Sequence, residues 1–211
     1  KNTHGFDWDP CEGGNYLMST AYLVRWSGPI YEDDDPYRPD ESDSSPPGLI
    51  PVKHVQDVFF IPARGSPTDN DNIKQAITTY GGVYSSFYYD DSYYNTITYN
   101  YFYSGTTSSN HAITLVGWDD NRVIPGAPSP GAFIVKNSWG SNWDEDGYFY
   151  ISYYDSKIGN SSAVMTSEGL ENYDKLAQHD PLGFTSSMGF TGSNVGWAAN
   201  IFTADSNEML K

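Results

Sequence analysis

Cysteine and basic residues are scarce in this chain of 211 residues. Its one cysteine, Cys11, cannot form a disulfide within the chain, so cysteine content sets no redox compartment. Lysine and arginine together number 11 against 27 acidic residues, which gives a formal net charge of -16. Because binding to phosphates or anionic lipids needs a cationic surface, this composition argues against a nucleic-acid partner and against an anionic membrane surface.

Long apolar runs are absent as well. No stretch of the sequence is long enough to cross a bilayer, so no transmembrane segment is expected. Residues 1–4, KNTH, begin polar and without an initiator methionine, and they have none of the features of a signal peptide. We therefore expect the chain to be a processed or excised piece of a longer protein.

Aromatic residues, in contrast, are abundant, with 18 Tyr, 10 Phe and 6 Trp, and they favour strands and turns. Apolar spacing predicts helices over 15–27, with Asn15 as N-cap, and over 72–80, with capping oxygens from residues 69–71. A set of short apolar runs bounded by turn residues predicts strands over 83–89, 97–103, 111–118, 132–137, 147–153 and 162–166. A helical front part followed by antiparallel strands predicts an α+β fold.

The acidic stretch 31–51 is predicted to be a solvated loop. Calcium binding by residues 32–35 is the sharper alternative, but the run lacks the ligand spacing and the glycine of an EF-hand loop. No metal site and no cofactor are therefore predicted. Residues 172–211 change in character and carry one strand-like run, 194–204, which suggests a linker plus the start of a further domain, or a packed tail.

Two stretches indicate chemistry. His111 opens the strand-like run HAITLVGWDD, and Asn137 ends a strand in which Phe133, Val135 and Asn137 share one face. A lone histidine before an apolar strand is usually packed or exposed. A neutral amide at the end of a buried strand, however, can accept an imidazole N–H without taking its proton, as a thiol enzyme requires.

These stretches resemble the papain family of cysteine peptidases. NSWGSNWDEDGY, from Asn137, is similar to the signature N-S-W-G-x-x-W-G-x-x-G-Y, except that Asp144 stands at the second W-G glycine. NHAITLVGW, from Asn110, resembles the strand that carries the catalytic histidine, and the CEGG segment at Cys11 resembles the family's C-N-G-G segment. Three motifs in the family's order imply a papain-like fold, with residues 1–171 as a partial peptidase domain and the strands in a barrel-like part.

The resemblance implies a role for each matching residue. His111 matches the catalytic histidine, Asn137 the residue that orients its ring, and Trp139 the tryptophan that shields their hydrogen bond and walls the leaving-group side. Residues expected to contact substrate are Gly13 and Gly14 through their backbone, and Asn15, Tyr16, Asn110 and Ala112 as the lining of the specificity pocket. The long loop 119–131 is hypothesised to overhang the leaving-group side of the cleft.

The nucleophile is expected outside this chain. In the family it lies in a C-G-S-C-W-like motif at the start of a helix, and nothing similar surrounds Cys11. The resemblance makes Cys11 half of a structural disulfide whose partner lies upstream. We therefore expect a missing N-terminal segment of the same precursor to supply the thiol, and this chain alone to hydrolyse no peptide.

The sequence thus predicts a cysteine-type endopeptidase, acting on peptide or protein substrates by a Cys-His-Asn mechanism. The tail DPLGFTSSMGF…NVGWAANIFTA resembles segments that follow papain-like domains in prokaryotic cell-surface proteases, where a lectin-like β-sandwich begins. That resemblance implies an extracellular or cell-surface protein. The alternatives are a non-catalytic adhesin or binding module that reuses the fold, and a papain-fold transferase or amidase, against which the N-S-W-G signature argues.

Overall fold

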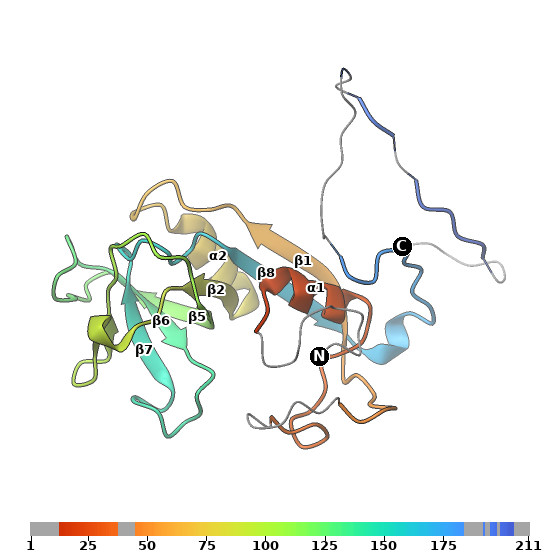
Figure 1. Ribbon diagram of the computed structural model, residues 1–211, viewed down its shortest axis with the longest axis horizontal. Helices are drawn as coiled ribbons and strands as arrows, with labels where there is room; N and C mark the ends of the chain where they lie inside the picture. The colour runs from red at the N-terminus through yellow and green to blue at the C-terminus, as the bar shows by residue number, and fades with distance from the viewer. Residues whose placement is uncertain (1–12, 38–44, 184–191, 193–194, 198, 205–211) are drawn as a thin grey trace. The chain divides into compact units, whose positions relative to one another are not determined.

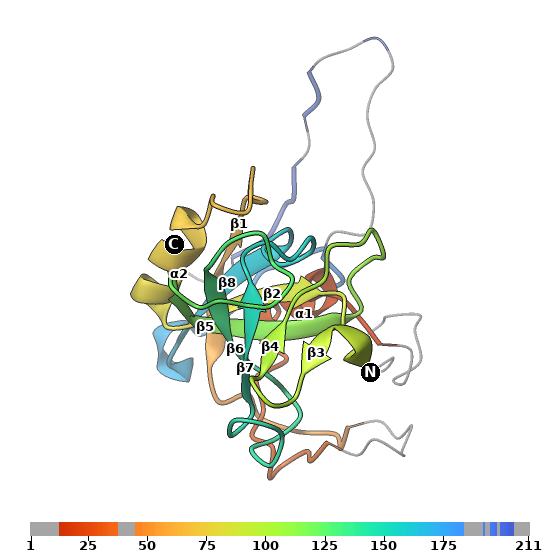
Figure 2. The same ribbon diagram turned by 90° about the vertical axis from the view of Figure 1, so that its left-hand side faces the viewer.

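The computed structural model describes residues 13–37, 45–183, 192, 195–197 and 199–204. The chain divides into two compact units, one formed by Lys1–Asp57 with Ser167–Lys211 and the other by Val58–Thr166. Figures 1 and 2 show the ribbon from two directions. Among the described residues, no helix has the length and apolarity needed to cross a bilayer. Cys11 lies outside the described residues.

The first unit contains α1 (Tyr16–Val24), which begins where the sequence predicts. Asn15 is extended, and its Oδ1 accepts the backbone N–H groups of Leu17 and Met18 at 3.0 Å each, which satisfies two of the unpaired donors of the first turn. The helix ends three residues before the predicted Ser27. Arg25, its C-cap, donates from Nη1 to the carbonyl of Pro181 at 2.8 Å.

The described C-terminal residues also belong to this unit. The short helix η3 (Leu170–Asn172) follows the last strand, and the ring of Tyr173 lies 6.5 Å from that of Trp26. The described residues of the predicted strand 194–204 form no strand, and the other residues of that stretch lie outside the described part of the chain.

The second unit holds α2 (Asp71–Tyr80), which lies against β2 (Val83–Phe87) and β5 (His111–Asp119) (Figure 1). Ile73, Ala76 and Ile77 form the buried stripe of α2, as the apolar spacing predicts. The expected cap is wrong in one respect: Asn70 makes no side-chain cap bond. Its Oδ1 instead accepts from Nη1 of Arg64 at 2.9 Å.

Eight strands form one sheet in the order β1-β8-β2-β5-β6-β7-β4-β3. The strands other than β2 and β5 are β1 (His54–Ile61), β3 (Tyr94–Asn95), β4 (Asn100–Tyr101), β6 (Ala132–Lys136), β7 (Tyr148–Ser152) and β8 (Ser162–Glu168). The pairs β2–β5, β5–β6 and β6–β7 are antiparallel, whereas β4 pairs with β7 in parallel. Together with the helices this is the predicted α+β architecture.

The observed strands differ from the predicted ones in three places. The strand expected over 97–103 is reduced to the two residues of β4, and β1 and β3 have no counterpart in the prediction.

The loop 119–131 follows the end of β5, whereas His111 begins that strand. At about 3.3 Å per residue, the nine residues of β5 separate His111 from Asp119, the first residue of the loop, by about 26 Å. The loop then returns toward β3, where Ile124 and Pro125 line a pocket together with Tyr93 and Tyr94. Its position over the leaving-group side of the cleft stays a prediction.

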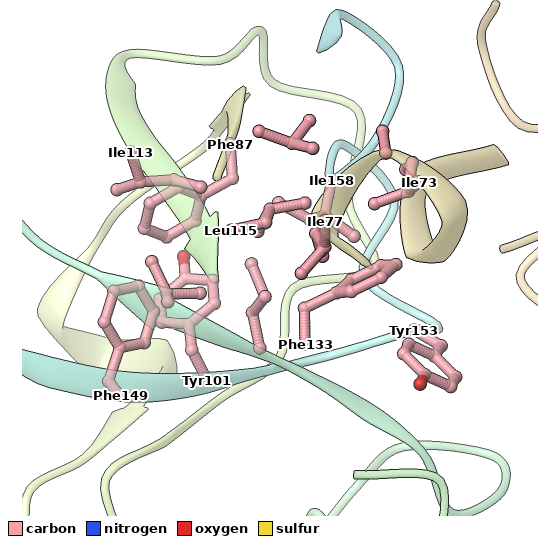
Figure 3. Close-up of a cluster of buried hydrophobic side chains, with 14 of the residues drawn as sticks. Ile73, Ile77, Phe87, Tyr101, Ile113, Leu115, Phe133, Phe149, Tyr153 and Ile158 are labelled. Atoms are coloured by element: carbon pink, nitrogen blue, oxygen red, sulfur yellow. The ribbon is translucent and has the colours of Figure 1, made fainter. Parts of the chain in front are cut away.

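The core of the second unit lies where α2 faces the central strands. Figure 3 shows Ile73 and Ile77 of α2 near Leu115 of β5 and Phe133 of β6, with Phe87, Tyr101 and Phe149 extending the cluster. Leu115 and Phe133 are completely buried. The same central strands β5 and β6 carry the candidate site, so the core fixes its position.

Candidate active site

Asn137 follows the last residue of β6, and two features of its loop hold it in place. Phe133 and Val135 are completely buried and Asn137 is 8% exposed, so the three share the buried face as the period of two predicts. The backbone N–H of Asn137 donates to the carbonyl of Gly147 at 2.9 Å, which closes the loop 137–147 just before β7 begins.

Gly147 explains one glycine of the signature. Its φ is 88°, in the left-handed region, and a Cβ there would lie 2.9 Å from the carbonyl oxygen of Gly140. Any other residue would be strained by its backbone and would press on that oxygen. The close approach of these two glycines shapes the loop whose closing bond anchors Asn137.

His111 begins β5 and shares the strand face of Ile113 and Leu115. Strands β5 and β6 are antiparallel, with Thr114 opposite Lys136. One further step in this register brings Asn137 opposite Ile113, diagonally across from His111. The sheet itself therefore brings the two predicted residues together.

The side chains of His111 and Asn137 are hydrogen bonded. His111 Nε2 lies 2.8 Å from Asn137 Oδ1, and the backbone N–H of Ser138 donates to the same oxygen at 2.9 Å. Because a backbone N–H needs an acceptor, the Ser138 bond fixes this amide atom as the oxygen. An amide oxygen only accepts, so Nε2 must be the ring nitrogen that carries the hydrogen.

This tautomer leaves Nδ1 of His111 for chemistry. In the neutral ring Nδ1 has a lone pair and can take a proton, and in the imidazolium it can give one away. No hydrogen bond from Nδ1 to another described residue is present. The arrangement is therefore suited to proton transfer at one defined atom.

Trp139 covers one face of the imidazole. The two rings are stacked, with centroids 4.8 Å apart and planes 28° from parallel. Trp139 is 43% exposed, so its indole has one side toward His111 and the other toward solvent. Tyr89 and Trp143 meet the same indole edge-on, at 4.8 Å and 5.1 Å.

Asn110 has a contact that the sequence does not reveal. Its Oδ1 accepts the backbone N–H of Tyr89 at 2.7 Å, and its Nδ2 donates to the Tyr89 carbonyl at 3.0 Å. The hydroxyl of Tyr89 in turn donates to Asp91 Oδ1 at 2.7 Å. Burial, and then this bond to Asp91, raise the pKa of Tyr89, so its hydroxyl stays protonated at neutral pH.

Tyr89 is thus a member of the site that sequence reasoning missed. It is fixed at its backbone by Asn110 and at its hydroxyl by Asp91, and it supports Trp139. It lies in a tyrosine-rich stretch without a recognisable motif, and its partner Asn110 is 21 residues away. No local signal in the sequence could have identified it.

The other predicted contact residues are exposed or half-buried. Ala112 is exposed on β5 beside His111, and Gly13, Gly14 and Asn15 are exposed in the first unit. Tyr16 is half-buried in the first turn of α1. Their contact with a substrate stays a prediction, as does the lining role of Asn110.

Within the described part of the chain, no group of three or more His, Cys, Asp or Glu side chains is arranged to hold a metal ion. The side chain that is hydrogen bonded to His111, that of Asn137, carries no charge.

Comparison with known proteins shows the family. Residues 3–167 match the papain family cysteine protease profile. The chain is 35% identical over 166 residues to Cathepsin B-like CP3 of Giardia intestinalis, which covers 74% of this chain and 52% of the relative. It is 30% identical over 156 residues to pro-cathepsin H of Bos taurus, which covers 71% of this chain and 42% of the relative.

The fold has solved counterparts too. The structure of the cysteine protease and lectin-like domains of Cwp84, a surface layer associated protein of Clostridium difficile, superposes with a TM-score of 0.71 at 28% identity. That match covers 82% of this chain and 40% of the other. The chain spans about half the length of the curated relatives it matches. With the signature, the fold and the profile in agreement, the chain belongs to the papain family of cysteine proteases.

Proposed function

We propose that this chain provides the histidine and the asparagine of a Cys-His-Asn endopeptidase, with His111 as the acid and base and Asn137 as its positioning residue. The observation that carries the proposal is the Nε2 to Oδ1 hydrogen bond of 2.8 Å, in which the amide orientation is set by Ser138. This arrangement frees Nδ1 to exchange a proton with a thiol and with a leaving amine.

The reaction follows from that geometry. A thiolate attacks the peptide carbonyl and forms the C–S bond, while the C–N bond breaks and Nδ1 of the His111 imidazolium gives its proton to the departing amine. Water then attacks the thioester as Nδ1 takes up a proton, and the thiolate is expelled as the carboxylic acid leaves. The neutral Asn137 amide serves both steps, because it holds Nε2–H whichever state Nδ1 is in.

The nucleophile in this proposal is a cysteine outside these 211 residues. Cys11 is the one cysteine of the sequence, and its CEGG context resembles a disulfide segment rather than a nucleophile motif. The thiol then comes from the N-terminal segment of the same precursor, and Cys11 is dispensable for the chemistry.

Substrate binding is proposed at exposed and half-buried residues in and beside the CEGG segment and beside His111. Gly13 has φ 82°, and a Cβ there would meet no atom of the described residues within 4 Å, which is compatible with the approach of an extended peptide to its backbone. Gly14, Asn15, Tyr16 and Ala112 complete the proposed substrate contacts, and Trp139 is the proposed wall on the leaving-group side.

The test uses the protein expressed from its complete reading frame. It is incubated with an internally quenched peptide and with a thiol-reactive peptidyl inhibitor, and the labelled cysteine is mapped by mass spectrometry. We expect hydrolysis, a label upstream of Lys1, and turnover by the folded fraction of the variant Cys11→Ser, in which a disulfide is lost but the nucleophile is kept. The 211-residue chain alone should neither cleave the peptide nor be labelled.

The opposite results are equally clear. A label on Cys11, or turnover by the 211-residue chain, would refute the placement of the nucleophile. Peptide binding by the complete protein without any cleavage would refute the peptidase and favour the adhesin.

We further propose an extracellular or cell-surface location, with residues 172–211 as a linker and the start of a lectin-like domain. The net charge of -16 is compatible with this, and the Cwp84 structure combines cysteine protease and lectin-like domains in a surface layer associated protein. Fractionation of the natural source tests the location, and recovery in the cytoplasm alone would refute it. Limited proteolysis of the complete protein tests the boundary, with a preferred cut near residue 172 expected.

A further inference from the structure

Asp144 is one of two residues with a Cβ in the loop 137–147 that have a positive φ, the other being Asp146 at 53°. The φ of Asp144 is 46°, in the left-handed region that residues with a Cβ rarely adopt. The signature that this sequence resembles has glycine at this position, for which such a conformation costs little. Aspartate adopts this conformation more often than most residues with a Cβ do, and Asp144 also makes a tertiary contact that can hold it there.

The tertiary contact is a hydrogen bond to Tyr94. The Tyr94 hydroxyl donates to Asp144 Oδ2 in a short contact, across 50 residues of sequence. Burial, followed by this bond, raises the pKa of Tyr94, so its hydroxyl remains a donor at neutral pH. Because Tyr94 belongs to β3, the bond ties the loop that carries Asn137 and Trp139 to the sheet.

The ring of Tyr94 leads back to the site. It is stacked on Trp143, with centroids 5.4 Å apart and planes 26° from parallel. Trp143 meets Trp139 edge-on at 5.1 Å, and Trp139 is stacked on His111 at 4.8 Å. Four rings thus form one continuous series of contacts, which begins at Tyr94 and ends at the imidazole of His111.

We propose that Tyr94 and Asp144 are a pair of positioning residues, which hold Trp143, and through it Trp139, against the His111 imidazole. This proposal rests on the proposed peptidase function. The pair acts on the face of His111 that Trp139 covers, where it limits the access of water to the His111–Asn137 hydrogen bond. It takes no part in the proton transfers themselves.

The other contacts of these rings make the expected effect partial. Phe149 meets Trp143 edge-on at 5.6 Å from the buried core, and Tyr89 supports Trp139 from another side. Loss of the Tyr94 hydroxyl therefore loosens the Trp139 stack without releasing it. The consequence is a lower kcat with at most a small rise in KM, since Trp139, the wall on the leaving-group side, is the one proposed substrate contact that is loosened.

The experiment compares three variants of the complete protein. Tyr94→Phe removes the hydroxyl, Asp144→Gly removes the carboxylate together with the backbone strain, and Asp144→Asn keeps an acceptor oxygen for Tyr94. Tyr93→Phe is the matched control, because the neighbouring hydroxyl of Tyr93 makes no hydrogen bond with any described residue. Thermal unfolding of each variant verifies that it is folded.

Two readouts separate positioning from stability. We expect Tyr94→Phe and Asp144→Gly each to lower kcat about fivefold, the effect of a hydrogen bond of ordinary strength, with at most a small rise in KM. In nuclear magnetic resonance of histidine-labelled protein, the Nε2 proton of His111 should exchange with water faster in both. The double variant should lose no more than either single one, and Asp144→Asn should match the wild type.

Wild-type kcat and wild-type proton exchange in Tyr94→Phe would overturn the proposal, and so would an equal loss in Tyr93→Phe or additive losses in the double variant. Absence of any peptide hydrolysis in the unaltered protein would refute the proposed function instead. The exchange of the Nε2 proton does not depend on turnover, so it still tests the positioning role in that case.

Discussion

Asn137 Oδ1 lies 2.8 Å from Nε2 of His111 while it also accepts the backbone N–H of Ser138 at 2.9 Å. The hydrogen bond from Ser138 determines which hydrogen bond Asn137 can make with His111. It orients the amide, the amide selects the Nε2–H tautomer, and the tautomer leaves Nδ1 for proton transfer. Strand pairing between β5 and β6 and the closed loop 137–147 supply the geometry.

Replacing Asn137 by alanine should therefore lower kcat/KM by about 100-fold in the complete protein, within the range typical of general acid–base groups. Without the amide, neither the tautomer nor the ring orientation is selected. Ser138→Ala is the matched control, because the contact of Ser138 with Asn137 is made by its backbone N–H. Peptide hydrolysis measures both, and a loss in Asn137→Ala no larger than in Ser138→Ala would contradict the assigned role.

Gly147→Ala should destabilise the protein by about 1–3 kcal/mol, the usual cost of a strained backbone position. The new Cβ would meet the Gly140 carbonyl oxygen at 2.9 Å with φ at 88°. Gly169→Ala is the control, since its φ is -67° and a Cβ there would meet no atom within 4 Å. Denaturant unfolding measures both, and equal stabilities would show that the loop adapts to the added carbon.

Asp155 gives stability a dependence on pH. Its carboxylate accepts backbone N–H groups from Tyr103, Lys157 and Ile158, yet burial raises its pKa to about 6. The folded state therefore binds this proton more tightly than the unfolded chain, whose carboxyl titrates near 3.8. The protonated Asp155 carboxyl therefore contributes its full stabilisation of the fold below about pH 4, and this stabilisation is lost as the pH rises through 6.

Unfolding free energies at pH 4 and pH 7 test this sign. From pH 4 to pH 7 the free energy of unfolding of the wild type should fall by up to about 3 kcal/mol more than that of Asp155→Asn. Asp120→Asn is the matched control, because hydrogen bonds from Lys74 and Tyr153 lower the pKa of Asp120 and move its titration below this window. The same dependence on pH in Asp155→Asn as in the wild type would contradict the assignment.

The central strands could be predicted from the sequence because their burial follows the strand period. Strands β5 and β6 have one face on the core, so Leu115, Phe133 and Val135 alternate with less buried residues. The signature then identifies Asn137 at the end of such a strand, and the register explains why His111 lies nearby. These local patterns were sufficient for the α+β class and for the pair at the centre of the site.

The short and outer strands could not be predicted. In place of the long strand over 97–103, Asn95 Oδ1 accepts the backbone N–H groups of Ile97 and Thr98, and Tyr99 has φ 55°. This local turn competes with the ladder. Strand β1 ends the sheet order and exposes the consecutive residues Phe59 and Phe60, so it lacks the alternation that marks a half-buried strand.

Long-range polar contacts were equally out of reach. Asn70 was expected to cap α2, but Arg64 takes its oxygen while also donating to the carbonyls of Tyr153 and Ile158. The bonds of Asn110 with Tyr89 and of Tyr94 with Asp144 likewise join residues far apart in the chain. Such partners meet only in the folded protein, so local sequence patterns cannot predict them.

The most direct measurement is active-site titration of the complete protein and its His111→Ala variant with a thiol-reactive peptidyl inhibitor, followed by peptide hydrolysis. We expect rapid labelling and turnover in the wild type, and a loss of both by about 100-fold or more in the variant, because the thiol then lacks its base. His179→Ala is the control, since His179 stacks on Phe202 and belongs to no motif. Wild-type labelling and turnover in His111→Ala would contradict the proposed role of His111 as the acid and base.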